Sequence, residues 1–240
     1  ERVNIAQEKH TVILEALQKR LDLVKTSIAE AESVQIHTFL CEGEVDENIF
    51  ELSEEKGIDL IVMGTFGING LKDRIWGSKT AGLTGKTNVP VMVIPYEYNW
   101  KVPEKILLAT SFFEEDRNVL EPITGLTDAF KATLHAVIFT DEDTADAALF
   151  LERGMNMADY ERKLKKLLNT ESIITGHLSG SKFEDTLQDY IKNNDIDILT
   201  MISYQRSLWD RIFHPSVTRR MSYHTTIPLL VIPANKKGEE

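Results

Sequence analysis

Three things are scarce in this sequence of 240 residues: cysteine, long apolar runs and basic charge. The single cysteine, Cys41, cannot form a disulfide within the chain, which suits a reducing cytosol. No stretch approaches the roughly 18 apolar residues of a membrane-spanning helix. A net charge of −11 argues against a basic face that binds nucleic acid or anionic lipid. We therefore expect a cytoplasmic protein that binds neither nucleic acid nor membrane.

What the sequence does contain is an internal repeat. Residues 58–95 match residues 196–233, with Asp59 opposite Asp197 and Pro95 opposite Pro233, each pair 138 positions apart. The match extends upstream, because 34–57 parallels 172–195. A repeat of this length indicates two copies of one folding unit.

The second copy alternates apolar strands with amphipathic helices. We predict strands over 105–110, 132–140, 172–179, 197–203 and 229–233. We predict helices over 114–130, 156–169 and 181–194, with an acidic loop before the second. Alternation of this kind indicates right-handed βαβ units and a parallel sheet. The near-continuous apolar runs ILLAT and LLVIP indicate strands that are covered on both faces.

The first copy is incomplete in this sequence. We predict helices over 3–30, 45–56 and 76–86 and strands over 34–41, 58–63 and 90–95, so the counterparts of 105–140 are missing. A sheet without its central strands would leave long unpaired edges, and we expect about 40–60 further residues ahead of Glu1. The predicted domains are 1–98, which lacks its N-terminal strands, and 99–240. Pairing of the terminal strands 90–95 and 229–233 is our hypothesis for how the two copies associate.

A glycine-rich loop, MGTFGINGLKDRIWGSKT (63–80), follows the predicted strand 58–63. In open α/β sheets, ligands bind beyond the carboxyl ends of the strands. Gly64 lets the chain turn off the strand, Gly67 leaves room for a sugar or phosphate, and Gly77-Ser78 opens a helix. The free N–H groups of a helix start favour phosphate. Spacing alone leaves open a second interpretation, in which the glycines only punctuate a βα connection.

The loop resembles the ATP-binding signature of the universal stress protein family, Gly-x2-Gly-x9-Gly-(Ser/Thr), here Gly64, Gly67 and Gly77-Ser78. The strand VPVMVIP that follows is also similar, and the resemblance extends over both copies, as in tandem members. It implies an α/β fold of two repeated doubly wound, Rossmann-like parallel sheets with strand order 3-2-1-4-5. It also implies that the loop holds the ribose and phosphates of ATP or another adenine nucleotide, with Mg²⁺ as a further candidate. The nucleotide-binding residues that it implies are Met63, Gly64, Gly67, Gly77, Ser78, Lys79 and Thr80.

Two further contacts that the family implies are an Asp at the end of the first strand and backbone groups of the second strand. In the first copy both would precede Glu1. In the second copy the Asp position is Ser111, and Met-Gly becomes Met201-Ile202. The remaining replacements are Ser203, Tyr204, Gln205 and Arg206 for Gly-x2-Gly and Pro215-Ser216 for Gly-Ser. We predict one nucleotide-competent copy and one structural copy, with anion binding by Arg206 as the weaker alternative.

No other motif predicts chemistry. GLTGKT (82–87) would need a glycine at position 80 to be a P-loop, and Thr80 stands there. The six histidines are scattered, and no nucleophile lies beside a base in the sequence, so we predict neither a metal site nor catalytic residues. We expect a stress-response sensor or adaptor rather than an enzyme, with self-association into oligomers. The alternatives are a nucleotide-independent interaction module and a slow nucleotide hydrolase.

Overall fold

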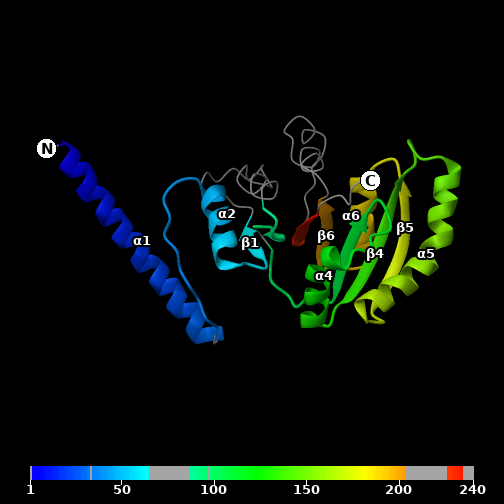
Figure 1. Cartoon of the computed structure of the whole chain (residues 1–240), viewed down its shortest axis with the longest axis horizontal. Coiled ribbons are helices and arrows are strands. Elements are labelled where there is room, and N and C mark those ends of the chain that lie inside the picture. The colour runs from blue at the N-terminus through cyan, green and yellow to red at the C-terminus, as the bar shows by residue number, and fades with distance from the viewer. Residues whose placement is uncertain (1, 33, 65–86, 97, 204–225, 235–240) are drawn as a thin grey trace. The chain divides into compact units, whose positions relative to one another are not determined.

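The computed structural model describes residues 2–32, 34–64, 87–96, 98–203 and 226–234 (coloured in Figure 1). It divides into two compact units, Glu1–Asn48 and Ile49–Glu240, and each is described by itself. The predicted domain ranges, 1–98 and 99–240, stay a prediction, because part of each lies outside the described residues. Within the described ranges, no helix is long and apolar enough to cross a bilayer.

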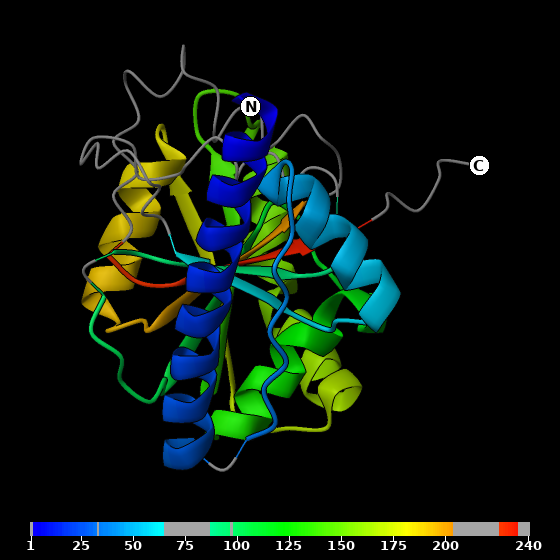
Figure 2. The same ribbon diagram turned by 90° about the vertical axis from the view of Figure 1, so that its left-hand side faces the viewer.

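The first unit consists mainly of α1 (Arg2–Glu32), an uninterrupted helix that is close to the predicted 3–30 (Figure 2). Residues 34–42 form neither helix nor strand, so the predicted strand over 34–41 is wrong. A strand is held by backbone hydrogen bonds to a neighbour, and no described strand pairs with this run. Its repeat counterpart, β5 (Ile173–Gly180), has such a neighbour in β4 (Thr133–Asp141).

α2 (Val45–Lys56) has the predicted bounds and begins after a turn that favours glycine. Gly43 has a φ of 109°, in the left-handed region that other residues rarely adopt. The side-chain amide of Asn48 donates to the carbonyl oxygens of Glu42 and Glu44, each at 3.0 Å. Asp46 and Glu47 lie in the first turn, where negative charge stabilises a helix.

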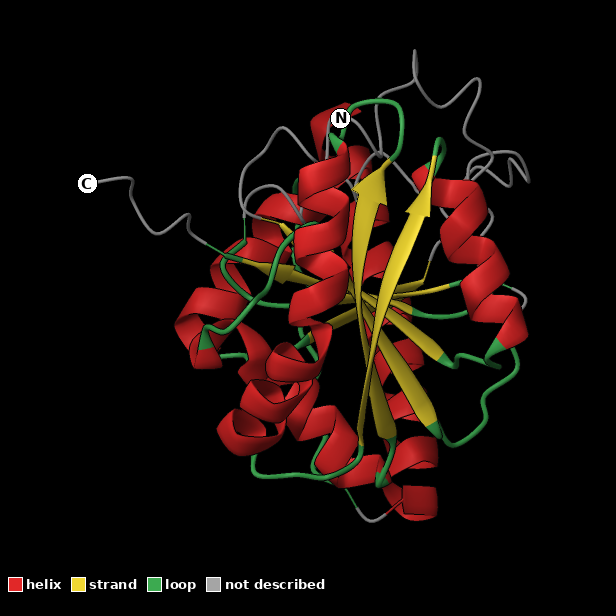
Figure 3. Cartoon of the chain, turned by 90° about the vertical axis from the view of Figure 1, so that its right-hand side faces the viewer, coloured by secondary structure: helices red, strands yellow, loops and turns green. Residues whose placement is uncertain are grey.

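The second unit contains one sheet whose seven described strands run in the order β1-β2-β7-β6-β3-β4-β5. Besides β4 and β5, the sheet contains β1 (Ile61–Gly64), β2 (Val91–Ile94), β3 (Lys105–Thr110), β6 (Ile198–Ser203) and β7 (Leu229–Pro233). Every pairing is parallel except that of β2 with β7. Figure 3 shows the strands fanning out, as the twist of a large sheet requires.

The second copy contributes β3 to β7 in the spatial order β5-β4-β3-β6-β7, which is the predicted order 3-2-1-4-5. The predicted strands agree with the observed bounds to within one residue at each end. The second predicted helix is wrong at its start, because α5 runs over Ala147–Leu168 instead of 156–169. The carboxylate of Asp146 accepts a hydrogen bond from the N–H of Leu149 at 2.7 Å and so caps the helix earlier.

Successive strand residues point to opposite faces of the sheet, and helices cover both faces. Leu108 packs with Ile123 of α4 (Arg117–Phe130) and Leu164 of α5 in one apolar cluster. Leu107 packs with Leu187 of α6 (Phe183–Asn193) in another. Burial on both faces explains why β3, β6 and β7 are apolar along most of their length.

The two copies meet at an antiparallel pairing of β2 with β7, which confirms our hypothesis for the terminal strands. Val91 lies opposite Val231, Met92 opposite Leu230, and Val93 opposite Leu229. All six residues are buried, and Met92 and Leu230 belong to the same apolar cluster. The ladder and the core therefore continue from one copy into the other.

The segment between the copies is tied to the second copy by Asp197. Its carboxylate accepts hydrogen bonds from the N–H groups of Glu104 at 2.7 Å and Lys105 at 2.9 Å, and it pairs with the Lys101 ammonium. Burial acts to raise the pKa of Asp197, but Lys101 and the two N–H donors outweigh burial, and the pKa lies below its ordinary value. Trp100 adds a ring contact with Phe130 at 6.0 Å.

Replacing Asp197 tests this anchor. We expect Asp197→Ala to lower the free energy of unfolding by about 2–4 kcal/mol, because the N–H groups of Glu104 and Lys105 lose a charged acceptor that is itself buried. The control is Asp59→Ala, because Asp59 is the exposed repeat counterpart and should change stability by less than about 0.5 kcal/mol. Urea unfolding followed by circular dichroism measures both. Equal effects of the two substitutions would contradict the anchoring role.

A buried histidine makes the core sensitive to acid. His135 of β4 is 4% exposed, and its Nδ1 lies 2.9 Å from the hydroxyl oxygen of Tyr190. Burial lowers the pKa of His135, and the nearby Lys105 ammonium lowers it further. The native state therefore binds a proton less readily than the unfolded chain, whose histidines titrate at about 6.5.

Stability should fall as the pH is lowered through about 6.5, because there the unfolded state takes up the proton first. The expected slope is up to about 1.4 kcal/mol per pH unit for this histidine. His135→Asn should reduce that slope, whereas His37→Asn, at an exposed position, should leave it unchanged. Unfolding free energies measured between about pH 5 and 8 give the slope. A slope that His135→Asn leaves as steep as before would rule out this origin.

Candidate functional site

Two of the predicted nucleotide-binding residues lie in the described part of the chain. Met63 and Gly64 are the last two residues of β1, paired with Val93 and Ile94 of β2. They therefore stand at a carboxyl strand end, where the prediction places the loop. The remaining predicted nucleotide-binding residues lie outside the described ranges: Gly67, Gly77, Ser78, Lys79 and Thr80.

Gly64 belongs to the strand rather than to a turn. Its φ is not in the left-handed region, and the expected turn off the strand falls on residues outside the described ranges. Among the described residues, and apart from its chain neighbours, no heavy atom lies within 4 Å of where a Cβ would stand. Met63 is half-buried and packs on the apolar cluster of Ile61, Val91 and Val93. The described part of the chain therefore supports the end of β1 through Met63 and places nothing against Gly64.

The corresponding end of the second copy is packed differently. Ile202 stands where the first copy has Gly64, and it is buried in the core. Ser111, at the position of the family's Asp, follows β3 directly. The other altered positions lie outside the described residues, and they are Tyr204, Gln205, Arg206, His214, Pro215 and Ser216.

Arg153, which belongs to no motif in the sequence, bridges two strand ends of the second copy. Its Nη1 donates to the carbonyl oxygen of Phe139 at 2.8 Å and to Thr140 Oγ1 at 2.7 Å. Its Nη2 donates to the carbonyl oxygen of Ser111 at 2.6 Å. Phe139 and Thr140 are on β4, Ser111 follows β3, and Arg153 comes from α5. One guanidinium therefore joins three elements.

Thr140 extends this contact to His177 of β5. The hydroxyl oxygen of Thr140 lies 2.8 Å from His177 Nε2, and the ring of Phe150 lies 4.8 Å from the imidazole. Burial lowers the pKa of His177, and the charge of Arg153 lowers it further. His177 is therefore a partner of a buried strand residue.

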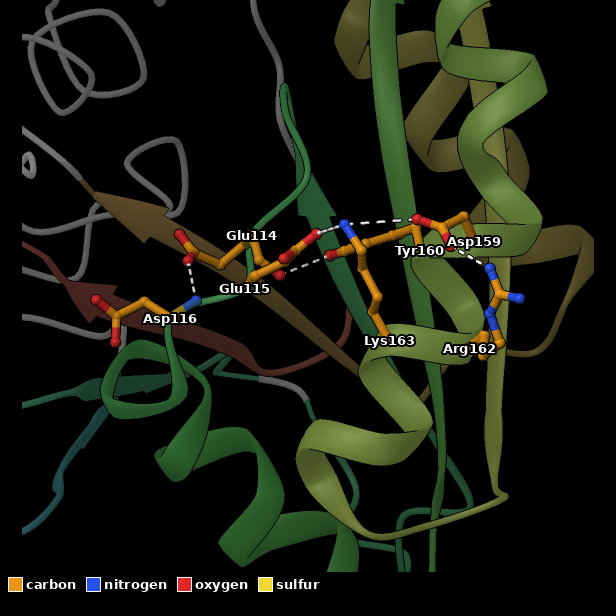
Figure 4. A network of polar contacts seen from close by, with 7 residues as sticks. All are labelled: Glu114, Glu115, Asp116, Asp159, Tyr160, Arg162 and Lys163. Carbon is orange, nitrogen blue, oxygen red and sulfur yellow. Dashed lines mark hydrogen bonds and ion pairs between the residues drawn. The ribbon is translucent and has the colours of Figure 1, made fainter.

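An acidic segment next to Ser111 is held onto α5 by the contacts in Figure 4. The carboxylate of Glu114 accepts from the N–H of Asp116 at 2.6 Å, and the Tyr160 hydroxyl donates to the carbonyl oxygen of Glu114 at 3.1 Å. Lys163 lies between Glu115 and Asp159, at 3.0 and 3.4 Å. Burial raises the pKa of Tyr160, which stays protonated and donates. These contacts fix the chain as it leaves β3.

The described residues hold no cluster of three or more His, Cys, Asp or Glu side chains arranged for a metal ion. Cys41 is exposed, in contrast to the burial expected of a lone cysteine in an apolar run. At the carboxyl ends of β3 and β4, the described polar groups of Ser111, Phe139 and Thr140 are bonded to Arg153. At the end of β1, none of the described residues packs against Gly64.

Comparison with known proteins identifies the family. The family model described as "Universal stress protein family" matches residues 3–95 and 103–233. Universal stress protein MJ0531 of Methanocaldococcus jannaschii is 40% identical over 77 residues, which is 32% of this chain and 45% of that protein. Universal stress protein YxiE of Bacillus subtilis is 36% identical over 76 residues, 32% of this chain and 51% of that protein. The chain thus aligns with about half the length of these relatives.

Solved structures share the fold. A universal stress protein from Archaeoglobus fulgidus has a TM-score of 0.66 at 18% identity and covers 95% of this chain and 80% of its own. PA1789 of Pseudomonas aeruginosa, described as functionally unknown, has a TM-score of 0.58 at 16% identity, over 94% of this chain and 78% of its own. Because the family model matches nearly the whole sequence, in two segments that correspond to the two copies, the chain belongs to the universal stress protein family and is of its tandem type.

Proposed function

We propose that the first copy binds ATP or a related adenine nucleotide on the loop that begins at Gly64. The observation that carries the proposal is the spacing of Gly64, Gly67 and Gly77-Ser78, which starts at the last residue of β1. A ligand at a carboxyl strand end meets free backbone groups, and a glycine there lets a phosphate or sugar approach. Lys79 and Thr80 would add a positive charge and a hydroxyl.

Other members of the family support the choice of ligand class. One solved universal stress protein is in complex with cAMP, and one from Archaeoglobus fulgidus is in complex with dAMP. Those ligands belong to those proteins, and the proposal for this chain rests on its own loop and its family. With a triphosphate, Mg²⁺ would be held chiefly through phosphate oxygens, since such sites use few protein ligands.

The proposed role is that of a stress-response sensor or adaptor in the cytoplasm, without turnover. A bound nucleotide stabilises the conformation that it prefers, and a partner can recognise that conformation. The second copy would serve as a structural half that extends the sheet through the pairing of β7 with β2. Self-association into oligomers stays part of the proposal.

The direct test is titration calorimetry of the natural full-length protein with ATP and Mg²⁺. We expect Gly67→Val to weaken ATP binding by about 100-fold or more, equivalent to about 3 kcal/mol, because the side chain enters the space of the sugar or phosphate. Gly125→Val is the matched control, because Gly125 lies on an exposed turn of α4 with open space around it. The control should retain both ATP affinity and melting temperature.

Unchanged ATP affinity in folded Gly67→Val would refute the assignment of the loop. Mass spectrometry of protein purified without added ligand separates the remaining possibilities. ATP that co-purifies supports the binding role, and ADP or AMP accumulating from added ATP would indicate a hydrolase. If the natural protein neither retains nor binds a nucleotide, the interaction module becomes the better account.

A further inference from the structure

At the carboxyl edge of the second copy's sheet, β4 extends further than its neighbour β3. The last pair in the ladder between β3 and β4 is Thr110 with Ile138. β4 continues through Phe139, Thr140 and Asp141, which pair with β5 on the other side. On the side that faces β3, the end of β4 therefore extends beyond the last β3–β4 pair. The polar groups on that side need partners other than β3.

This end of β4 lies beside the position at which open α/β sheets bind ligands. The chain passes from β3 outward to β4 and β5 and then returns to β6 on the other side of β3. That reversal is a topological switch point, and ligands of open α/β sheets bind in the crevice at the carboxyl ends there. The acceptors available on the β4 side are the carbonyl oxygens of Ser111 and Phe139 and the hydroxyl of Thr140.

One side chain of the protein occupies all three acceptors. Arg153 reaches them from α5 at 2.6–2.8 Å, and these contacts are all with neutral oxygens. A guanidinium is planar and presents its N–H donors in a fixed fork. A nucleobase with an exocyclic amino group is also planar and also donates to carbonyl oxygens from its edge. The two groups would compete for the same acceptors.

We propose that Arg153 is a built-in plug that closes the nucleoside end of the second copy's crevice. The guanidinium takes the hydrogen bonds that an amino-bearing base would form and fills the space beside β3 and β4. The second copy then excludes nucleosides by occupying its own site, in addition to the altered loop that follows β6. This inference concerns the second copy alone, and it stands whether or not the first copy binds a nucleotide.

The surroundings of Arg153 fit a fixed plug. Thr140 accepts from the guanidinium and also contacts His177, whose ring is covered by Phe150. On the other side, the segment after Ser111 is held by Tyr160 through the carbonyl oxygen of Glu114. Both the donor and its acceptors are therefore held in place from more than one element.

The test removes the plug in a background that silences the first copy. All variants carry Gly67→Val, so any nucleoside effect must arise elsewhere than on the first copy's loop. Arg153→Ala is compared with Arg162→Ala, which removes the same charge from the same helix at an exposed position paired with Asp159. The probe is adenosine, and the readout is the melting temperature of the full-length protein as adenosine is raised.

Without adenosine, Arg153→Ala should melt about 4 °C or more below the background, since three charge-assisted hydrogen bonds are lost. Saturating adenosine should restore about 2–4 °C to this variant by binding its folded state. Adenosine should leave the background and Arg162→Ala unchanged. The proposal is overturned if adenosine fails to raise the melting temperature of Arg153→Ala, or raises that of the background by as much.

Arg153→Lys decides the case if the alanine variant does not fold. Lysine keeps the charge and the apolar stem, but a single ammonium cannot reproduce the planar fork. Adenosine should then raise the melting temperature of Arg153→Lys by a smaller, dose-dependent amount. No rise in Arg153→Lys would overturn the proposal.

Discussion

The pairing of β2 with β7 is the interaction on which the described sheet depends. Either strand alone would end its half with a row of unpaired N–H and C=O groups and an exposed apolar margin. Joined in register at Val91 and Val231, each satisfies the other, and Met92 and Leu230 enter a common core. The short first-copy strands β1 and β2 are thereby attached to a five-stranded sheet that is closed by helices on both faces.

Much of this fold is predictable from the sequence because it follows from local patterns. Runs such as KILLAT and LLVIP are typical of strands that are covered on both faces, and the repeat at Asp59 and Asp197 indicates that the unit occurs twice. The errors occur where distant residues decide. Residues 34–42 have strand-like residues but no described partner strand, and α5 starts early because Asp146 caps it. Equivalent positions of the repeat also differ in their contacts. The buried Asp197 accepts hydrogen bonds from the segment between the copies, whereas Asp59 is exposed.

In the candidate site, too, one part is predictable from the sequence and another is not. The glycine spacing from Gly64 is visible in the sequence, and the structure places its first residue at a strand end. Arg153 could not have been found, because its acceptors at Ser111 and Phe139 are 42 and 14 residues away in sequence. No spacing rule relates them, and only the packing of α5 against the sheet brings them together. The replacements at Ser111 and Ile202 predict a degenerate copy, but they do not point to Arg153.

The antiparallel joint also decides the direction in which each half faces. β1 is parallel to β2, β7 is parallel to β6 and β3, and the direction reverses only between β2 and β7. The carboxyl ends of the two sets of strands therefore emerge from opposite edges of one continuous sheet. A molecule seated at Gly64 and the guanidinium of Arg153 lie at opposite edges, so no single small ligand can touch both. Among the described residues, the strands and the core between the two edges are what connects them.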